Sequence, residues 1–192
     1  MKRLVFATSN AHKLSEIRGI LPHFDIAGLQ DIGISEDIEE TGTTLEENAL
    51  IKAKFLYEKT RMPSLSEDTG LEVFSLNGAP GVHTARYAGD EKDPEKNMEK
   101  LLAELEYKSN RQARFRTVIS YVAQDETHFF EGIVNGSIAL KKSGAKGFGY
   151  DPVFIPEGFD QSFADLDVFI KNKISHRARA VSKLIDFLSQ SQ

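Results

Sequence analysis

The chain contains no cysteine, and its 192 residues carry no excess of positive charge and no long hydrophobic run. Without cysteine there is no disulfide framework, no thiolate metal site and no cysteine nucleophile, which fits a reducing compartment. Because Lys+Arg 24 stand against Asp+Glu 29, the net charge is −5, which disfavours a protein that binds nucleic acid by neutralising phosphates. The apolar run Leu4–Ala7 is too short for a signal peptide or a membrane span, so we expect a cytoplasmic protein without membrane contact.

The remaining composition is that of an ordinary globular protein, with 40% hydrophobic and 28% charged residues. No segment is of low complexity, and no motif repeats with a period of about 20 to 50 residues. At roughly 100 to 200 residues per domain, the length suits one sizeable domain. We therefore expect residues 1–192 to form a single domain with two lobes.

Hydrophobic periodicity predicts a strand followed by a helix at the start of the chain. The strand covers Leu4 to Thr8, and the helix that follows ends before Pro22. Thr43 and Glu46 have the spacing of a capping box, which predicts a second helix from about Thr44 to Lys59.

The second half of the chain adds two helices and a long hairpin. Asp93 can cap a third helix with Pro94 at its first position, and the last helix is expected to open at Ser175 as N-cap. Residues from Gln112 to Leu140 alternate in hydrophobicity around the pair Asp125-Glu126, which predicts a long antiparallel hairpin. The pattern predicts a mixed α/β fold, with a bent mixed central sheet and helices in two lobes.

The turn between the first strand and the first helix is a candidate phosphate site. Its residues are Thr8, Ser9, Asn10, Ala11, His12 and Lys13. Backbone N–H groups and the positive end of a helix dipole attract an anion, and Lys13 adds a full charge. The same residues also fit a plain N-cap at Asn10 with a solvated lysine, and the turn lacks the glycine spacing of a Walker loop.

Two acid pairs, each followed by Thr-Gly, form a candidate metal site. They are Glu39-Glu40 before Thr41-Gly42, and Glu67-Asp68 before Thr69-Gly70. The strand-like residues before the second pair would place Asp68 at a carboxyl end of the sheet, where α/β proteins bind ligands. Mg2+ prefers a few carboxylates together with water and phosphate oxygens. Acids before glycine turns are also commonplace, so composition alone leaves a surface turn open.

Two further segments could bind a flat ligand. In the loop Gly147 to Pro152, glycines flank Phe148, so a ring could stack on it, although an aromatic turn packed on the core fits equally well. Near the last helix, His176 and Arg177 place cations at a helix N-terminus, where the dipole disfavours them, and Lys171 precedes them. This anomaly suggests an anionic or hydrogen-bond-accepting partner, and a structural histidine with an exposed arginine is the alternative.

These signals belong to six blocks that follow one another along the chain. The blocks are Thr8-Ser9-Asn10-Ala11-His12-Lys13; Glu39-Glu40-Thr41-Gly42 with Glu47-Asn48-Ala49 and Lys52-Ala53; Glu67-Asp68-Thr69-Gly70-Leu71; Gly78-Ala79-Pro80-Gly81-Val82 with Ala85-Arg86-Tyr87; Gly147-Phe148-Gly149-Tyr150-Asp151-Pro152; and Lys171 with Ile174-Ser175-His176-Arg177. Together they resemble the inosine triphosphate pyrophosphatase family. The resemblance implies hydrolysis of non-canonical purine nucleoside triphosphates (ITP, dITP, XTP) to the monophosphate and pyrophosphate, in a nucleotide-binding cleft flanked by the two lobes.

The resemblance also implies a role for each site residue. The triphosphate would be held by Thr8, Ser9, Asn10, Ala11, His12, Lys13, Lys52 and Thr69. The purine would be bound by Phe148, which stacks on it, and by Gly149, Tyr150, Asp151, Lys171, His176 and Arg177. Glu40 and Asp68 would hold Mg2+, with Asp68 as the proton acceptor for the attacking water. The resemblance further implies a homodimer. We expect the loop Gly78 to Tyr87, which is rich in small residues and in which His83 and Tyr87 should be exposed, to form part of its contact.

Two other functions are compatible with the sequence. One is a Maf-type pyrophosphatase for modified pyrimidine triphosphates, which also uses acids and a phosphate-holding first loop. The other is a non-catalytic module that binds a nucleotide without hydrolysing it. The intact acid pairs disfavour the second of these.

Overall fold

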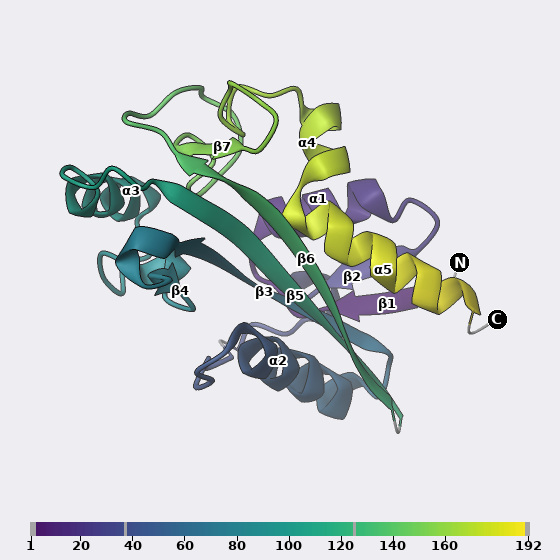
Figure 1. Ribbon diagram of the computed structural model, residues 1–192. Helices are drawn as coiled ribbons and strands as arrows, with labels where there is room; N and C mark the ends of the chain where they lie inside the picture. Colours follow the sequence, from purple (N-terminus) through teal and green to yellow (C-terminus); the bar gives the residue numbers. More distant parts are fainter. Residues whose placement is uncertain (1–2, 37, 125, 191–192) are drawn as a thin grey trace. The chain divides into compact units, whose positions relative to one another are not determined.

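The computed structural model describes residues 3–36, 38–124 and 126–190, which form a mixed β-sheet, five α-helices and the loops between them (Figure 1). The strands are β1 (Arg3–Phe6), β2 (Asp25–Gly28), β3 (Ser64–Val73), β4 (Pro80–Gly81), β5 (Gln112–Ala123), β6 (Glu126–Ile138) and β7 (Phe154–Pro156). The helices are α1 (Ala11–Ile20), α2 (Leu45–Thr60), α3 (Pro94–Glu104), α4 (Val168–Ile174) and α5 (His176–Gln190), with 3-10 turns at η1 (Gln30–Ile32), η2 (Phe74–Leu76) and η3 (Thr84–Arg86). None of the helices in these ranges is long and apolar enough to cross a membrane.

The sheet has the strand order β2-β1-β3-β5-β6-β7, with β4 paired to β3. Strand β1 is parallel to β2 and to β3, whereas β4 is antiparallel to β3 and β7 is antiparallel to β6. The long strands β5 and β6 are consecutive neighbours and form the predicted hairpin (Figure 1). The prediction of a mixed α/β fold with a long hairpin is therefore confirmed.

The chain divides into two compact units. The first contains residues 1–68, 117–132 and 177–192, and the second contains residues 69–116 and 133–176. Strands β3, β5 and β6 contribute residues to both units. The cleft that the resemblance implies, and the single two-lobed domain, stay predictions.

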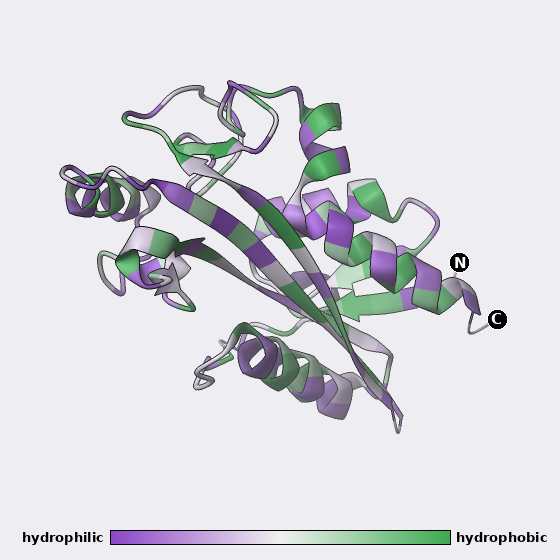
Figure 2. Ribbon diagram, viewed as in Figure 1, coloured by the Kyte–Doolittle hydropathy of each residue, from purple (hydrophilic) through white to green (hydrophobic). Residues whose placement is uncertain are grey.

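In the first unit, helices cover both faces of the strands. Ile17 of α1 and Val181 of α5 are buried in one hydrophobic cluster with Leu65 of β3, whereas Leu56 of α2 is buried in another with Val5 of β1. Successive strand residues point to opposite faces, so the two clusters lie on opposite sides of the sheet. Figure 2 shows β1 as almost entirely hydrophobic, as expected for a strand covered on both faces.

The core of the second unit joins helix α3 to a group of aromatic rings. Met98 and Leu101 of α3 are buried in the same cluster as Phe115, Phe154 and Phe163. The rings of Phe115 and Phe154 meet edge to face, with centroids 4.7 Å apart. This cluster supports the segments that carry the predicted purine-binding residues.

Several local predictions are confirmed. Asp93 caps α3 by accepting hydrogen bonds from the backbone N–H groups of Glu95 and Lys96, and Pro94 takes the first helical position. The last helix, α5, begins directly after Ser175. Asp125, which was placed between the two hairpin strands, lies outside the described residues.

Two local predictions are wrong. The capping box of α2 is formed by Thr44 and Glu47, one residue later than Thr43 and Glu46, because Thr44 adopts the extended backbone of an N-cap. Thr69-Gly70 is also no turn, because β3 continues through it and pairs with β4 at Leu71. Asp68 therefore lies within a strand rather than at its carboxyl end. The parallel strand β1 ends at Phe6, which pairs with Leu65 of β3. Asp68 therefore lies in the part of β3 that extends beyond the end of β1.

Candidate functional site

Two carboxylates of the first unit converge on one ammonium group. Lys52 Nζ on α2 donates to Glu40 Oε1 at 2.6 Å and to Asp68 Oδ1 at 3.5 Å. Asn48, one helical turn before Lys52, donates from its amide to Asp68 Oδ2 at 3.3 Å. Both oxygens of Asp68 thus contact side chains of one face of α2. The structure brings together three residues that the sequence assigned separately to the metal and the triphosphate.

The loop that carries Glu40 is tied to α2 through Gly42. The backbone N–H of Gly42 donates to Asn48 Oδ1 at 2.8 Å. A side chain at this position would place its Cβ 2.6 Å from that same oxygen, so only glycine permits the approach. Gly42 therefore has a structural role, because it fixes the loop that carries Glu40 against α2.

The surroundings of Asp68 favour a carboxylate that can accept a proton. Burial raises the pKa of Asp68 above its ordinary value, although the charge of Lys52 opposes this effect. The pair Glu40 and Asp68 also supplies hard oxygen ligands, which suit Mg2+. No cluster of three or more His, Cys, Asp or Glu side chains suited to a metal occurs within the described ranges. Two carboxylates fit Mg2+ because that ion completes its shell with water and phosphate oxygens.

Glu67 points to the other face of β3 and meets a different pair of cations. Arg177 of α5 donates to both of its carboxylate oxygens, from Nε to Oε2 and from Nη2 to Oε1, each at 2.7 Å. Lys13 Nζ lies 3.1 Å from Glu67 Oε1, and Arg177 Nη1 also donates to Glu16 of α1. Burial alone would raise the pKa of Glu67, but the charges of Arg177 and Lys13 hold it well below its usual range.

The predicted phosphate turn has the features of both of its interpretations. Asn10 caps α1 by accepting hydrogen bonds from the backbone N–H groups of His12 and Lys13. Ser9, Asn10, Ala11 and His12 are exposed. Lys13 is not solvated, however, since its side chain is 19% exposed and pairs with Glu67. The turn therefore presents a helix N-terminus together with a cation that is already held in place.

In the second unit, the loop after Lys146 and helix α4 meet at an ion pair. Lys171 Nζ donates to Asp151 Oδ2 at 2.7 Å, and both side chains are buried. The same carboxylate oxygen accepts the backbone N–H of Phe148 at 2.7 Å. Lys171 Nζ lies 5.1 Å from the centroid of the Phe148 ring, within cation–π range. The half-buried ring of Phe148 thus lies beside a hydrogen-bond acceptor, the carboxylate of Asp151, and a donor, the ammonium of Lys171.

Gly147 makes this arrangement possible. Its φ is +79°, and a Cβ there would lie 2.2 Å from Asp151 Oδ2. The backbone therefore has to pass close to the carboxylate of Asp151, and no side chain fits between them.

The other predicted residues of the second unit have these positions. The His176 ring is buried and stacks on Phe115, with centroids 4.6 Å apart and an interplanar angle of 19°. Tyr150 is buried as well, and its hydroxyl donates to the backbone carbonyl of Thr84 at 3.0 Å. Burial raises the pKa of Tyr150. Thr69 is half-buried in β3.

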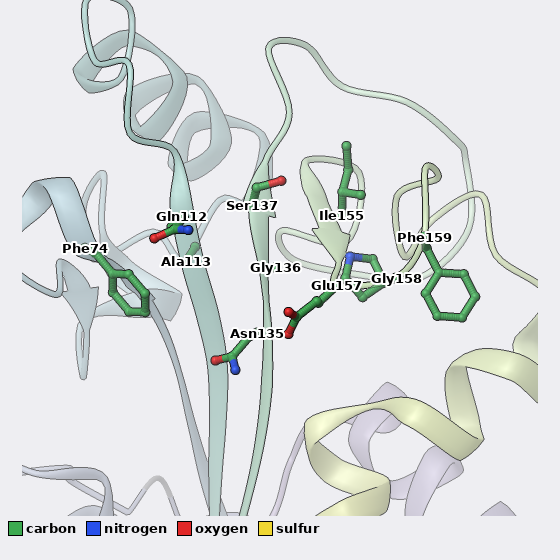
Figure 3. A pocket seen from close by; sticks show the side chains of 11 residues that line it. Phe74, Gln112, Ala113, Asn135, Gly136, Ser137, Ile155, Glu157, Gly158 and Phe159 are labelled. Atoms are coloured by element: carbon green, nitrogen blue, oxygen red, sulfur yellow. The ribbon is translucent and has the colours of Figure 1, made fainter.

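Figure 3 shows a pocket of the second unit with a volume of about 430 Å³. It is lined by Phe74, Gln112, Ala113, Asn135, Gly136, Ser137, Ile155, Pro156, Glu157, Gly158 and Phe159. None of the residues that the sequence assigned to substrate or metal is among them. Of the predicted site residues of this unit, Phe148 lies beside the Asp151–Lys171 pair.

The sequence assigns no site role to Asn48, and it treats Glu67 only as one member of an acid pair. Asn48 stands four positions before Lys52 on a predicted helix, and this spacing could have placed it beside the same partners. Glu67 precedes Asp68 in a strand, and strand alternation could have assigned the two acids to opposite faces. Neither the helical spacing nor the strand alternation predicts which side chains these residues contact. Arg177, for example, is 110 positions away from Glu67 in the sequence.

Fold and site together define an α/β protein with paired carboxylates, ion-paired lysines and a capped helix N-terminus. The model of the Ham1 family matches residues 4–187, and the chain belongs to this family. It is 50% identical over 189 residues to a dITP/XTP pyrophosphatase of Christiangramia forsetii, which covers 98% of this chain and 100% of the relative. A dITP/XTP pyrophosphatase of Porphyromonas gingivalis is 52% identical over 98% of both chains.

Solved structures agree with this assignment. The Staphylococcus aureus Ham1 protein superposes with a TM-score of 0.91 at 41% identity, over 100% of both chains. A dITP/XTP pyrophosphatase from Mycobacterium abscessus has a TM-score of 0.77 at 36% identity, over 95% of this chain and 98% of the other. The resemblance stated from the six sequence blocks is therefore confirmed.

Proposed function

We propose that the chain hydrolyses non-canonical purine nucleoside triphosphates, namely ITP, dITP and XTP, to the monophosphate and pyrophosphate. Relatives of the same length and about half identity are named dITP/XTP pyrophosphatases, which supports the proposal. The structural observation that carries it is the convergence of Glu40 and Asp68 on the ammonium of Lys52. This combination suits a phosphorylated substrate, because the ammonium attracts phosphate oxygens and the carboxylates can hold Mg2+ beside them.

Asp68 is the proposed proton acceptor. Water attacks the α-phosphorus, one of its protons passes to the Asp68 carboxylate, and the bond between the α-phosphorus and the bridging oxygen breaks as pyrophosphate leaves. Glu40 and Asp68 would hold Mg2+, which when bound supplies charge neutralisation at the phosphoryl oxygens and a lower pKa for water. A carboxylate that binds a cation is a weaker base, and the burial that raises the pKa of Asp68 works against that loss.

The triphosphate is assigned to the first unit. The turn Thr8 to His12, which is exposed from Ser9 onward, offers backbone groups at the N-terminus of α1, where the helix dipole favours an anion. Lys13 and Lys52 add two ammonium groups, and Thr69 follows the last residue that β3 contributes to this unit. The substrate charge is thereby balanced by cations that carboxylates already orient.

The purine is assigned to the second unit, where Phe148 would stack on the ring and Gly149 and Tyr150 would complete the loop. The Asp151–Lys171 pair gives a physical basis for base selection. Hypoxanthine and xanthine offer an O6 acceptor beside an N1–H donor, which matches an ammonium donor beside a carboxylate acceptor. Adenine offers the opposite pattern and would leave buried groups unpaired, which costs about 1 to 3 kcal/mol for each group. Guanine has the same O6 and N1–H edge, so its exclusion must come from contacts around its 2-amino group. His176 and Arg177 remain predicted base contacts.

One assay tests the proposal. Pyrophosphate release is measured for ITP, dITP, XTP, ATP, GTP and a set of modified pyrimidine triphosphates, with Mg2+ and with the metal chelated. We expect Mg2+-dependent release from the first three and poor release from ATP and GTP. Comparable turnover of ATP would contradict the selectivity, and a preference for modified pyrimidines would indicate the Maf-type activity. Binding of ITP without any pyrophosphate would indicate a non-catalytic module.

We also propose a homodimer whose contact includes the loop Gly78 to Tyr87. His83 is exposed in this loop, as the sequence suggested, whereas Tyr87 is half-buried and its hydroxyl donates to Glu104. His83 is therefore the side chain to change. Light scattering on the wild type and on His83→Glu should show a dimer and a weakened dimer, and a monomeric wild type would refute the assembly.

A cytoplasmic location is the last part of the proposal. The substrates belong to the nucleotide pool, and the chain lacks cysteine, which fits a reducing compartment. Cell fractionation with an antibody against the chain tests this, and recovery outside the cytoplasm would refute it.

A further inference from the structure

Glu67 has no part in the function proposed above, yet two cationic side chains contact it. Its side chain is fully buried and contacts the guanidinium of Arg177 and the ammonium of Lys13. A buried charge with such partners is costly to keep unless the geometry is good, so its surroundings suggest a task.

Arg177 fixes the orientation of this carboxylate. Two parallel hydrogen bonds of 2.7 Å run from the guanidinium to the two oxygens of Glu67, which is the bidentate geometry that arginine provides. Arg177 itself is 1% exposed and donates from its third nitrogen to Glu16. The carboxylate of Glu67 is therefore clamped from the side of α5.

The clamped carboxylate in turn holds Lys13. Glu67 Oε1 lies 3.1 Å from Lys13 Nζ, and Lys13 belongs to the first turn of α1. The helix dipole disfavours a cation at that end, so without Glu67 the ammonium would be repelled from the turn that it is expected to serve. Strand alternation places Asp68 on the opposite face with Lys52, so the two adjacent acids hold the two lysines separately.

We propose that Glu67 is a positioning residue: clamped by Arg177, it holds the ammonium of Lys13 where the triphosphate binds. This inference rests on the proposed function, because the triphosphate is its assumed ligand. Glu67 acts through Lys13 and is not itself in contact with the substrate.

Steady-state pyrophosphate release from dITP tests the proposal in a double-mutant cycle. The variants are Glu67→Gln, Lys13→Met and their combination, with Glu36→Gln as the matched control, because Glu36 pairs with Lys59 at 3.0 Å on an exposed surface. We expect E67Q to raise KM by about 10-fold to 100-fold, as losing a hydrogen bond to a charged group does. In the K13M background the same change should alter KM by less than about threefold, because coupled residues are not additive. E36Q should leave KM and kcat unchanged.

A merely structural role gives a different result. E67Q would then leave KM unchanged, or would change KM equally in the presence and absence of Lys13, and either outcome overturns the proposal. Glu67→Asp keeps the charge and shortens the side chain, so it carries the test if E67Q does not fold. E67D should fold and raise KM, and a wild-type KM in a folded E67D overturns the proposal. A wild type that releases no pyrophosphate from dITP, ITP or XTP is the failure of the proposed function itself.

Discussion

Replacing Asp68 with asparagine separates its chemistry from its packing. The amide has nearly the same shape as the carboxylate, and it keeps a carbonyl oxygen that can accept from Asn48 or Lys52. It cannot accept the proton of the attacking water. Loss of a general base reduces turnover by about 10²-fold to 10⁴-fold, which corresponds to about 3 to 5 kcal/mol of transition-state stabilisation. We therefore expect kcat of Asp68→Asn to fall by this amount.

The folded state should tolerate the change. Burial raises the pKa of Asp68 in the folded protein, so the ionised form is less favourable there than in the unfolded chain. A carboxylate with a raised pKa contributes stability at low pH and loses it as the pH rises through the folded pKa. At neutral pH the asparagine variant escapes that cost, and Lys52 keeps its 2.6 Å contact with Glu40. Thermal unfolding should show a melting temperature no lower than that of the wild type.

The assay is kcat for pyrophosphate release from dITP, measured together with the melting temperature. The matched control is Asp25→Asn, since Asp25 is an exposed strand residue that pairs with Arg3 at 3.5 Å. Its kcat should be that of the wild type, because exposed ion pairs contribute only about 0 to 1 kcal/mol to stability. A wild-type rate in a folded Asp68→Asn variant would remove Asp68 from the mechanism.

Three further predictions follow from the local structure. Phe148→Ala should raise KM for dITP by roughly 5-fold to 150-fold, because stacking of a base on an aromatic ring contributes about 1 to 3 kcal/mol, and an unchanged KM would mean that the ring only packs on the loop. Gly147→Ala should lower the free energy of unfolding by about 1 to 3 kcal/mol, because a Cβ at φ +79° would meet Asp151. The control is Gly19→Ala in α1, where a Cβ would have no atom within 4 Å, and it should stabilise the protein by about 0.4 to 1 kcal/mol. Equal effects of the two substitutions in thermal unfolding would contradict this prediction. The pKa of Glu67 is lowered in the folded state, so its stabilisation is present above the ordinary pKa of 4.5 and is lost as the pH falls below that value. When stability is measured against falling pH, Glu67→Gln should therefore lose less of it than the wild type. Parallel curves for the two proteins would refute the assignment.

The sequence predicted best what neighbouring residues determine. Helix α3 begins where Asp93 and Pro94 place it, because a cap and a fixed φ act within one turn. The two strands of the hairpin could be predicted as well, because hydrophobic and polar residues alternate along them. The sequence predicts a turn at Thr69-Gly70 and therefore ends strand β3 too early. In the structure the local turn preference is overridden by pairing with β4, which begins only at Pro80.

The pairing of the site's charges could not be predicted for a related reason. The sequence shows which acids and cations exist, but their partners depend on contacts between elements far apart in the chain. Glu67 and Asp68 are adjacent, and a sequence reading treats them as one acidic pair. The strand separates them, so that Glu67 meets α1 and α5 while Asp68 meets α2.

These pairings change the meaning of the net charge of −5. Each of the four cations assigned to the substrate contacts a carboxylate: Lys13 and Arg177 contact Glu67, Lys52 contacts Glu40 and Asp68, and Lys171 contacts Asp151. If these cations bind the proposed polyanionic substrate, the acids orient them before it arrives, which lowers the entropic cost of ordering long side chains on binding. In the proposed function, phosphate oxygens must then compete with carboxylates for the ammonium groups of Lys13 and Lys52, the two cations assigned to the triphosphate. That competition favours a ligand with several closely spaced charges, such as a triphosphate, over a single phosphate group.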